Sequence, residues 1–293
     1  MKIGVISDIH SNYPAFKACV DYMEREACDE YIFLGDYISD CPHTKQVMEL
    51  LYQMIEKHSC HLIRGNREDY ILDQWKVRRQ INDGPEWIKN SASGNLLFTY
   101  ERLDEKDLEF LDSLPITMVY RVEGYPAITC AHGSPDNSRQ LLQLDGEPVK
   151  EWLDKIETDY LLCAHTHFPG IRKYGSKTYI NSGCSGIAIG DQGLAQCLIL
   201  HDEVIDDIVT WVPEFLTLPY DYESVVQDMF ESGLYEYGHW FINSNIQILR
   251  TGVDNAAKLV KLATDISGQV WPNIDEKYFA QAAEILGVPE YGA

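Results

Sequence analysis

Seven residues of the types that bind divalent metal ions occur along residues 8–167. They combine carboxylate and carboxamide oxygens with imidazole nitrogens, a donor set typical of transition-metal sites. In two cases the residues lie two positions apart, so both side chains can point the same way just past a strand. The seven are Asp8, His10, Asp36, Asn66, His132, His165 and His167. Singly, each would more often be a structural polar residue, but the ordered set predicts a metal site.

Each of these residues follows a short apolar run that has the composition of a buried β-strand. The runs are rich in β-branched and aromatic residues, and glycine or polar residues end them. Functional groups of open α/β sheets lie at the carboxyl ends of the strands. We therefore expect the seven side chains to meet at one edge of the fold. The runs cover residues 3–6, 31–34, 61–63, 127–131 and 160–164.

Helical patterns separate the first three runs. We expect Asn12 to cap a helix that has Pro14 in its first turn, and a second helix over 43–57. Residues 69–113 also have a largely helical pattern. Alternation of strands and helices predicts an α/β fold with at least partly parallel pairing.

The second half of the chain first returns to strands and then changes to helices. Residues 117–123 alternate as a half-exposed strand does, and 197–200 with 208–211 predict a hairpin. Composition changes near 213–219, after which we expect Asp254 to begin one helix and Gly287 to end another. The helices expected there cover 221–232, 235–249, 254–267 and 275–286.

These patterns predict two parts, a main domain over 1–213 and a helical appendage over 214–293. We expect the appendage and residues 69–113 to border the mouth of the site, because the metal-binding loops need walls to discriminate between substrates. The alternative role for the appendage is packing or oligomerisation.

The five motif blocks resemble those of the calcineurin-like metallophosphoesterases, over about residues 1–212. That family carries D-x-H, G-D, G-N, a His before Gly, and G/A-H-x-H; the blocks here are Asp8-Ile9-His10, Gly35-Asp36, Gly65-Asn66, Ala131-His132-Gly133 and Ala164-His165-Thr166-His167. The resemblance implies a four-layer α/β/β/α sandwich with a two-metal centre. By position it implies that Asp8, His10 and His167 hold one metal, that Asn66, His132 and His165 hold the other, and that Asp36 bridges them.

Two departures from the family pattern limit what can be carried over. The family's protein phosphatases extend G-D into G-D-x-x-D-R-G, whereas this chain continues as Tyr37-Ile38-Ser39-Asp40-Cys41, which argues against a Ser/Thr phosphatase. Many members have a proton-donating His after the G-N asparagine, where this chain has Arg67. The nearer relatives would be the bacterial phosphodiesterase-like and dinucleoside-polyphosphate-hydrolase-like branch. The residues expected to act on the substrate are Arg67, Asp36 and His132.

Bound metals would reverse the local charge of an acidic protein. Two divalent cations carry about +4 and two ligand carboxylates about −2, which leaves about +2 to attract phosphate. Such a pair can activate water and clamp a phosphoryl group. Mixed nitrogen and oxygen ligands favour two ions of Mn, Fe, Zn or Co over Ca or Mg, and we favour Mn.

The resulting hypothesis is a two-metal phosphoesterase that cleaves phosphodiester or phosphoanhydride bonds in a small anionic substrate of nucleotide type. The alternatives are a phosphomonoesterase and a metal-binding scaffold that has lost catalysis.

Two single residues each have an alternative interpretation. Arg67 could instead pair with Glu68 or Asp69 on the surface, and Asp40 could be either a neighbour of the metal ligands or a solvated loop acid. The histidines outside the motifs are expected to be structural or exposed: His43, His58, His61, His201 and His239.

The remaining composition excludes several classes of function. The 24 Lys and Arg against 46 Asp and Glu give a net charge of −22, which argues against gripping nucleic acid or anionic lipid. The 8 cysteines form no C-x-x-C pair and several lie in apolar runs, as buried thiols do. Neither a secretory signal nor an apolar stretch of about 18 residues is present. We expect a soluble, cytoplasmic protein.

Overall fold

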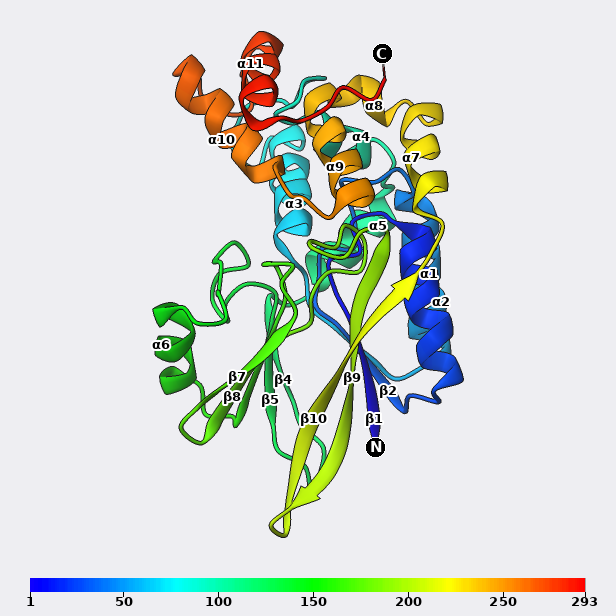
Figure 1. Ribbon diagram of the computed structural model, residues 1–293, viewed down its shortest axis with the longest axis vertical. Coiled ribbons are helices and arrows are strands. Elements are labelled where there is room, and N and C mark those ends of the chain that lie inside the picture. Colours follow the sequence, from blue (N-terminus) through cyan, green and yellow to red (C-terminus); the bar gives the residue numbers. More distant parts are fainter. Residues whose placement is uncertain (293) are drawn as a thin grey trace.

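Two five-stranded sheets lie face to face at the centre of the molecule in the computed structural model, which describes residues 1–292 (Figure 1). The first sheet has the order β10-β9-β1-β2-β3, and the second has the order β4-β5-β6-β8-β7. The strands of the first sheet are β1 (Lys2–Ile6), β2 (Glu30–Phe33), β3 (Cys60–Leu62), β9 (Leu194–Ile205) and β10 (Ile208–Pro219). Those of the second are β4 (Thr117–Tyr120), β5 (Ile128–Ala131), β6 (Tyr160–Cys163), β7 (Gly170–Tyr174) and β8 (Lys177–Asn181).

The middle strands of both sheets pair in parallel, as the alternation of strands and helices predicts. β1, β2 and β3 run parallel in the first sheet, and β5, β6 and β8 in the second. The flanking pairs β1 with β9, β4 with β5 and β7 with β8 are antiparallel. Parallel pairing brings the carboxyl ends of β1, β2 and β3 to one edge of the first sheet, and those of β5 and β6 to one edge of the second.

Apolar side chains fill the space between the sheets, and helices cover both outer faces. The inner layer includes Val5, Ile32, Leu162 and Trp211, all buried. Helices α1 (Tyr13–Arg25) and α2 (Thr44–Lys57) cover the first sheet, and α6 (Glu147–Lys155) covers the second (Figure 1). The predicted four-layer α/β/β/α sandwich is confirmed.

The local predictions for the N-terminal half hold in outline. Asn12 caps α1, because its side-chain oxygen accepts a hydrogen bond from the Ala15 amide at 3.2 Å. Residues 69–113 form separate helices instead of one continuous pattern, because the turn-forming run 82–85 interrupts them. The helices of this region are α3 (Asn66–Arg78), α4 (Gly94–Tyr100) and α5 (Glu105–Ser113).

The predicted hairpin is longer than its apolar runs indicated, and it crosses the expected boundary at 213/214. β10 pairs with β9 as far as Pro219, with Pro213 opposite Leu200. β10 is an edge strand, where a proline without an N–H group interrupts no ladder. The composition change at Pro213 therefore lies within the strand and does not mark its end.

The C-terminal helices lie at the carboxyl-end edge of the sheets, beside α3 and α4 (Figure 1). The helix predicted over 235–249 is divided at Gly238, and Gly287 ends the last helix at a φ of 67° as expected. Phe98 of α4 and Ile187 share an apolar cluster with these helices, so the segment packs on the main body. None of the helices in residues 1–292 is long and apolar enough to span a membrane. The helices are α7 (Tyr222–Glu231), α8 (Leu234–Tyr237), α9 (His239–Thr251), α10 (Ala256–Ser267) and α11 (Glu276–Leu286).

Candidate metal centre

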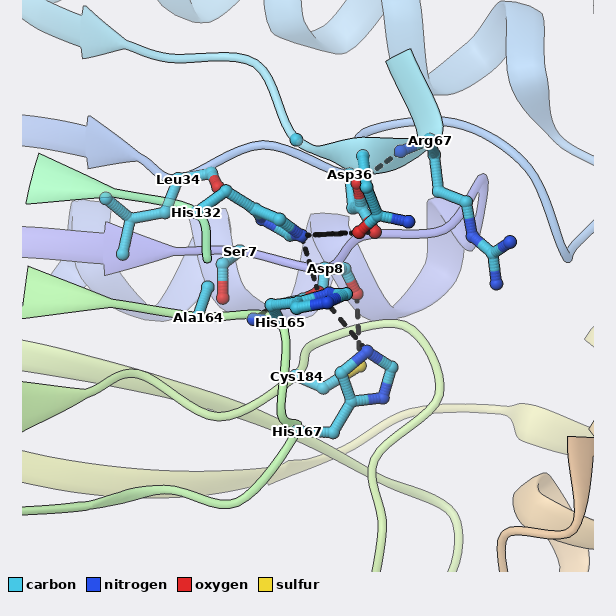
Figure 2. Close-up of polar contacts among 12 residues, drawn as sticks. Ser7, Asp8, Leu34, Asp36, Arg67, His132, Ala164, His165, His167 and Cys184 are labelled. Carbon is cyan, nitrogen blue, oxygen red and sulfur yellow. Dashed lines mark hydrogen bonds and ion pairs between the residues drawn. The ribbon is translucent and has the colours of Figure 1, made fainter. Parts of the chain in front are cut away.

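The fold brings the seven predicted ligand residues together. Asp8 and His10 follow β1, Asp36 follows β2, and Asn66 begins α3 after β3. His132 follows β5, and His165 and His167 follow β6. Figure 2 shows side chains from both sheets pointing toward one another in the space between the strand ends. The site therefore lies between the two sheets.

The backbone at five of these positions adopts the left-handed conformation. Residues other than glycine seldom do so, since the conformation crowds the side chain against its own backbone. Here it turns the chain sharply where a strand ends, which aims the side chain into the site. The φ angles are 50° at Asp8, 50° at His10, 52° at Asp36, 66° at His165 and 60° at His167.

One group of ligand atoms surrounds Asp8. Its Oδ1 lies 3.2 Å from His167 Nε2 and 3.8 Å from His10 Nε2. His10 Nε2 is in turn 3.9 Å from Asp36 Oδ2. The ligand atoms of Asp8, His10 and Asp36 all lie within 4.8 Å of one another, close enough to hold one ion.

A second group surrounds His132. Its Nε2 lies 3.0 Å from Asn66 Oδ1 and 3.4 Å from Asp36 Oδ2. The ligand atoms of Asp36, His132 and His165 lie within 4.8 Å of one another. Asp36 thus belongs to both groups.

The chemistry of the donors fits divalent cations. Asp8 Oδ1 is buried and accepts no hydrogen bond within residues 1–292, although three imidazole nitrogens lie within 4 Å of it. Burial would raise the pKa of the Asp36 carboxyl, but His132 and His10 together outweigh burial, so this pKa is lowered. Burial has the same effect on Asp8, where the combined effect of His167, His132 and His10 lowers the pKa. Both carboxylates are therefore held ionised in a buried space, where a cation would satisfy them.

The imidazoles are oriented by groups behind them. His132 Nδ1 lies 2.8 Å from the Leu34 carbonyl oxygen, so the Nδ1–H group donates there and leaves Nε2 free as a metal ligand. His10 Nδ1 lies 2.8 Å from Asp40 Oδ2, so a carboxylate lies next to that ring. His165 Nε2 is 3.3 Å from the Arg139 carbonyl oxygen, which leaves Nδ1 for the site.

Comparison with known proteins agrees with this geometry. Residues 1–169, more than half of the chain, match the calcineurin-like phosphoesterase family. The chain belongs to that family. The chain is also similar to the uncharacterized protein MJ0912 of Methanocaldococcus jannaschii, which is 22% identical over 183 residues, or 62% of this chain and 68% of that protein.

Two solved structures share the fold of this calcineurin-like phosphoesterase. The hypothetical protein PH1004 from Pyrococcus horikoshii OT3 has a TM-score of 0.69 at 20% identity, and the match covers 86% of this chain and 99% of that one. A metallophosphoesterase from Sphaerobacter thermophilus has a TM-score of 0.64 at 21% identity, over 86% and 100% of the two chains. A match over 86% of the chain includes part of the C-terminal helical segment.

Asp40 is a residue whose role the sequence left open, and the structure places it beside the predicted metal ligands. It is fully buried, and its Oδ2 lies 2.9 Å from Arg67 Nη2 as well as 2.8 Å from His10. Asn95 of α4 donates a hydrogen bond to Oδ1 at 2.7 Å, and Asn245 of α9 donates to the backbone oxygen at 3.2 Å. Burial would raise the pKa of Asp40, but Arg67, His10 and Asn95 together outweigh burial, so this pKa is lowered. The neighbouring Tyr37, Ile38 and Cys41 could have indicated a buried loop.

Arg67 lies at the edge of the site and pairs with Asp40. This excludes the surface pairing with Glu68 or Asp69 as its main contact. Its side chain is 22% exposed and lines a cavity, and its backbone amide donates to Asp36 Oδ1 at 2.8 Å. Figure 2 shows its guanidinium on the side of Asp36 away from His132.

The buried carboxyl group of Glu68 holds together the loops after β2 and β3. This role of Glu68 was not predicted from the sequence. Its oxygens accept hydrogen bonds from the backbone amides of Gly65 at 2.7 Å, Asp36 at 2.8 Å and Tyr37 at 2.9 Å. Burial, followed by the charge of Asp36, raises its pKa to about 8. The G-N-x-E spacing of a helix N-terminus was the signal for it.

Cys184 is a further unpredicted neighbour of the metal ligands. Its sulfur and the ring nitrogens of His10 and His167 lie within 4.8 Å of one another. The thiol contacts the Asp8 backbone oxygen at 3.2 Å. The sequence indicated only that several cysteines are buried, which holds for Cys184.

Two polar residues at the end of β8 and the histidines outside the motifs do not belong to the cluster. Asn181 donates to the Ala164 backbone oxygen at 2.7 Å, and Ser182 contacts Ser7 at 2.7 Å, so both brace the ligand loops. The five non-motif histidines pair with acidic side chains away from the site, as expected for structural residues. The pairs are His43–Asp228, His58–Glu24, His61–Glu30, His201–Glu214 and His239–Glu290.

A cavity of about 960 Å³ opens directly on the cluster. His10, Asp36 and Asn66 form part of its lining, and so do Tyr70 of α3 and Ile248 of α9. The prediction that residues 69–113 and the C-terminal helices border the mouth of the site is therefore confirmed. A volume of this size suits a small organic ligand.

Proposed function

We propose that this phosphoesterase hydrolyses phosphodiester or phosphoanhydride bonds with two divalent transition-metal ions bound by the seven ligand residues. The observation that carries the proposal is that Asp36 belongs to both groups of ligand atoms. A carboxylate shared between two sites is the arrangement expected where paired ions act on one phosphoryl group. A nucleotide-type substrate would match the size of the cavity.

When bound, the ions would supply charge neutralisation of the phosphoryl oxygens and an activated water. The donors are mostly imidazole nitrogens and carboxylate oxygens, which suit Mn, Fe, Zn or Co better than Ca or Mg. We favour Mn and use it in the tests. Asp8, His10 and His167 would hold one ion, and Asn66, His132 and His165 the other. Asp36 would bridge them.

The chain's own contribution to catalysis centres on Arg67. Its guanidinium is fixed by Asp40 at 2.9 Å and can donate hydrogen bonds to the phosphoryl oxygens that carry developing charge. Burial would lower the pKa of Arg67, but the nearby acidic groups, of which Asp40 has the largest effect, together outweigh burial and raise this pKa. The guanidinium therefore stays charged and cannot donate a proton. Substrates with good leaving groups should therefore be preferred.

The test compares bis(4-nitrophenyl) phosphate with 4-nitrophenyl phosphate as substrates of the Mn-loaded protein. We expect the diester to have the higher kcat/KM. Preference for the monoester would support the phosphomonoesterase alternative. Turnover of neither, with two ions demonstrably bound, would support the scaffold alternative.

A matched pair of variants ties the activity to the site. His132→Gln should lose turnover, because it removes a ligand nitrogen next to Asp36. His201→Gln should retain it, because His201 pairs with Glu214 away from the site. Equal activity in the two variants would mean that a contaminating enzyme is being measured.

A further inference from the structure

Three large apolar side chains on the surface gather around the cavity at the cluster. Leu141 is 54% exposed, and Phe168 and Val253 are each 49% exposed. All of them line the cavity. Exposed apolar side chains that converge on one hollow are typical of a ligand-binding surface.

The two walls of the cavity come from opposite parts of the molecule. Leu141 lies between β5 and α6, and Phe168 lies between β6 and β7, so this wall belongs to the second sheet. The opposite wall belongs to the C-terminal helices and includes Phe241 and Ile248 of α9, with Val253 just before α10. Figure 1 shows α9 and α10 beyond the strand ends. The predicted ligands of the metal ions lie at one end, between these walls.

Two aromatic rings are also part of the cavity lining. The rings of Tyr70 and Trp271 are 6.1 Å apart between centroids, and both line the cavity. The Arg139 guanidinium lies 4.2 Å from the centroid of the Tyr70 ring. Rings at such spacing leave faces and edges on which another aromatic group can pack.

A phosphoryl group alone would fill only a small part of the cavity, whose volume is about 960 Å³. With that group at the ligand cluster and Arg67, the rest of a substrate has to lie between the two apolar walls. An aromatic group gains most from such walls, because it buries a large apolar area without losing hydrogen bonds to water.

We propose that this cavity is a specificity site for the substrate group that stays bonded to phosphorus, and that it selects an aromatic ring system over small alkyl groups. The proposal rests on the proposed function for the position of the phosphoryl group. Phe168 and Val253, one from each wall, are the specificity-determining residues.

The experiment keeps the leaving group constant, which separates the cavity from any effect of Arg67. The Mn-loaded protein is given 4-nitrophenyl phenylphosphonate or 4-nitrophenyl methylphosphonate, which both release 4-nitrophenolate. After correction for the alkaline hydrolysis rate of each compound, we expect kcat/KM to be about 10- to 100-fold higher for the phenyl compound. Equal corrected values would overturn the proposal.

Three variants locate the effect. Phe168→Ala and Val253→Ser should each lower the phenyl-to-methyl ratio by about threefold or more. Val204→Ser is the matched control, because Val204 is 70% exposed in the β9–β10 hairpin and does not line the cavity. The control should keep the native ratio. Variants that scale both compounds by the same factor would overturn the assignment of these two residues.

Calorimetric binding distinguishes failure of this inference from failure of the proposed function. Phenylphosphonate and methylphosphonate are titrated into the Mn-loaded protein without any reaction. Tighter binding of the phenyl compound, together with no turnover of either ester, would support the cavity and refute the esterase. Equal binding would refute the cavity.

Discussion

Asp36 contributes to both groups of ligand atoms, so its loss should affect two metal positions at once. Asp36→Asn removes the charge but keeps the shape, and we expect metal content to fall from about two ions per chain to less than one. Turnover should fall by about 100-fold or more. Metal analysis by plasma mass spectrometry measures the first effect.

Asp40→Asn is the control for that variant, because Asp40 lies beside His10 and is not itself a predicted ligand. It should retain more metal than Asp36→Asn. If Asp36→Asn keeps two ions and near-normal turnover, the bridging assignment is wrong.

A second prediction for a single residue concerns Arg67. Arg67→His would place a group with a pKa near neutrality where the family often has a proton donor. We expect kcat/KM for esters with poor leaving groups to rise relative to aryl esters, so that the dependence on leaving-group pKa becomes flatter. Arg121→His, at an exposed position, is the control and should keep the native dependence.

Two results would contradict this prediction, and the first concerns the native protein. If its rates already show no dependence on leaving-group pKa, another residue supplies the proton. The same conclusion would follow if Arg67→His brings no gain on alkyl esters.

The ligand residues could be predicted from the sequence because each is a polar residue that ends an apolar run. Asp40 and Glu68 could not be assigned in the same way. Their burial depends on α3, α4 and α9 packing over the loop after β2, which involves residues as distant as Asn245. A local pattern carries no information about such contacts.

Among the elements, the start of α3 joins two ligand loops through Glu68. Glu68→Gln keeps the size of the side chain but replaces one of its two accepting oxygens with an NH₂ group, so at least one of the three backbone amides that the carboxyl group now satisfies loses its acceptor. We expect a loss of about 1–3 kcal/mol in the free energy of unfolding. Metal affinity should fall with it, because the link between the loops after β2 and β3 is weakened.

Chemical denaturation and metal titration check both effects. Glu109→Gln on the exposed surface of α5 is the control and should change neither quantity. A Glu68→Gln protein of native stability would show that the carboxyl group is not the anchor.

The elements themselves were predictable to different degrees. Strands with two buried faces, such as β5 and β6, have continuous apolar sequences and were located closely. The hairpin β9–β10 extends beyond its apolar runs, because its outer part is exposed and is held by pairing alone. The division between α8 and α9 depends on the backbone of Gly238, which an apolar period does not reveal.

At the scale of the whole molecule, the C-terminal helices are packed tightly on α4. A Cβ atom added at Gly94 would lie only 1.7 Å from the Tyr237 backbone oxygen. Gly94→Ala should therefore push α8 away from α4 and cost about 1–3 kcal/mol of stability. Limited proteolysis should cut residues 214–293 faster. Gly146→Ala is the control and should leave this cleavage rate unchanged, because a Cβ atom at Gly146 would contact Gln143 and Pro148 and not the C-terminal helices. Unchanged proteolysis would mean that the helices tolerate the shift.

The predicted ligands also join the two halves of the sandwich. Asp8, His10 and Asp36 come from the first sheet, and His132 and His165 come from the second. Bound ions would therefore link the sheets, in addition to the apolar layer that includes Trp211. Unfolding would destroy the site, so metal binding and stability must be coupled.

This coupling predicts a metal-dependent melting temperature. At free Mn²⁺ about 100 times the Kd, each site adds about 2.7 kcal/mol to the free energy of unfolding. Because 1 kcal/mol shifts the Tm of a large domain by about 2–4 °C, chelation with EDTA should lower the Tm by several degrees. EDTA should change the Tm of Asp36→Asn little, because that variant has already lost most of its metal. His201→Gln is the control, and its Tm should fall as that of the native protein does. A native Tm that is independent of Mn²⁺, in protein that metal analysis shows to be loaded, would mean that the ions bind outside the space between the sheets.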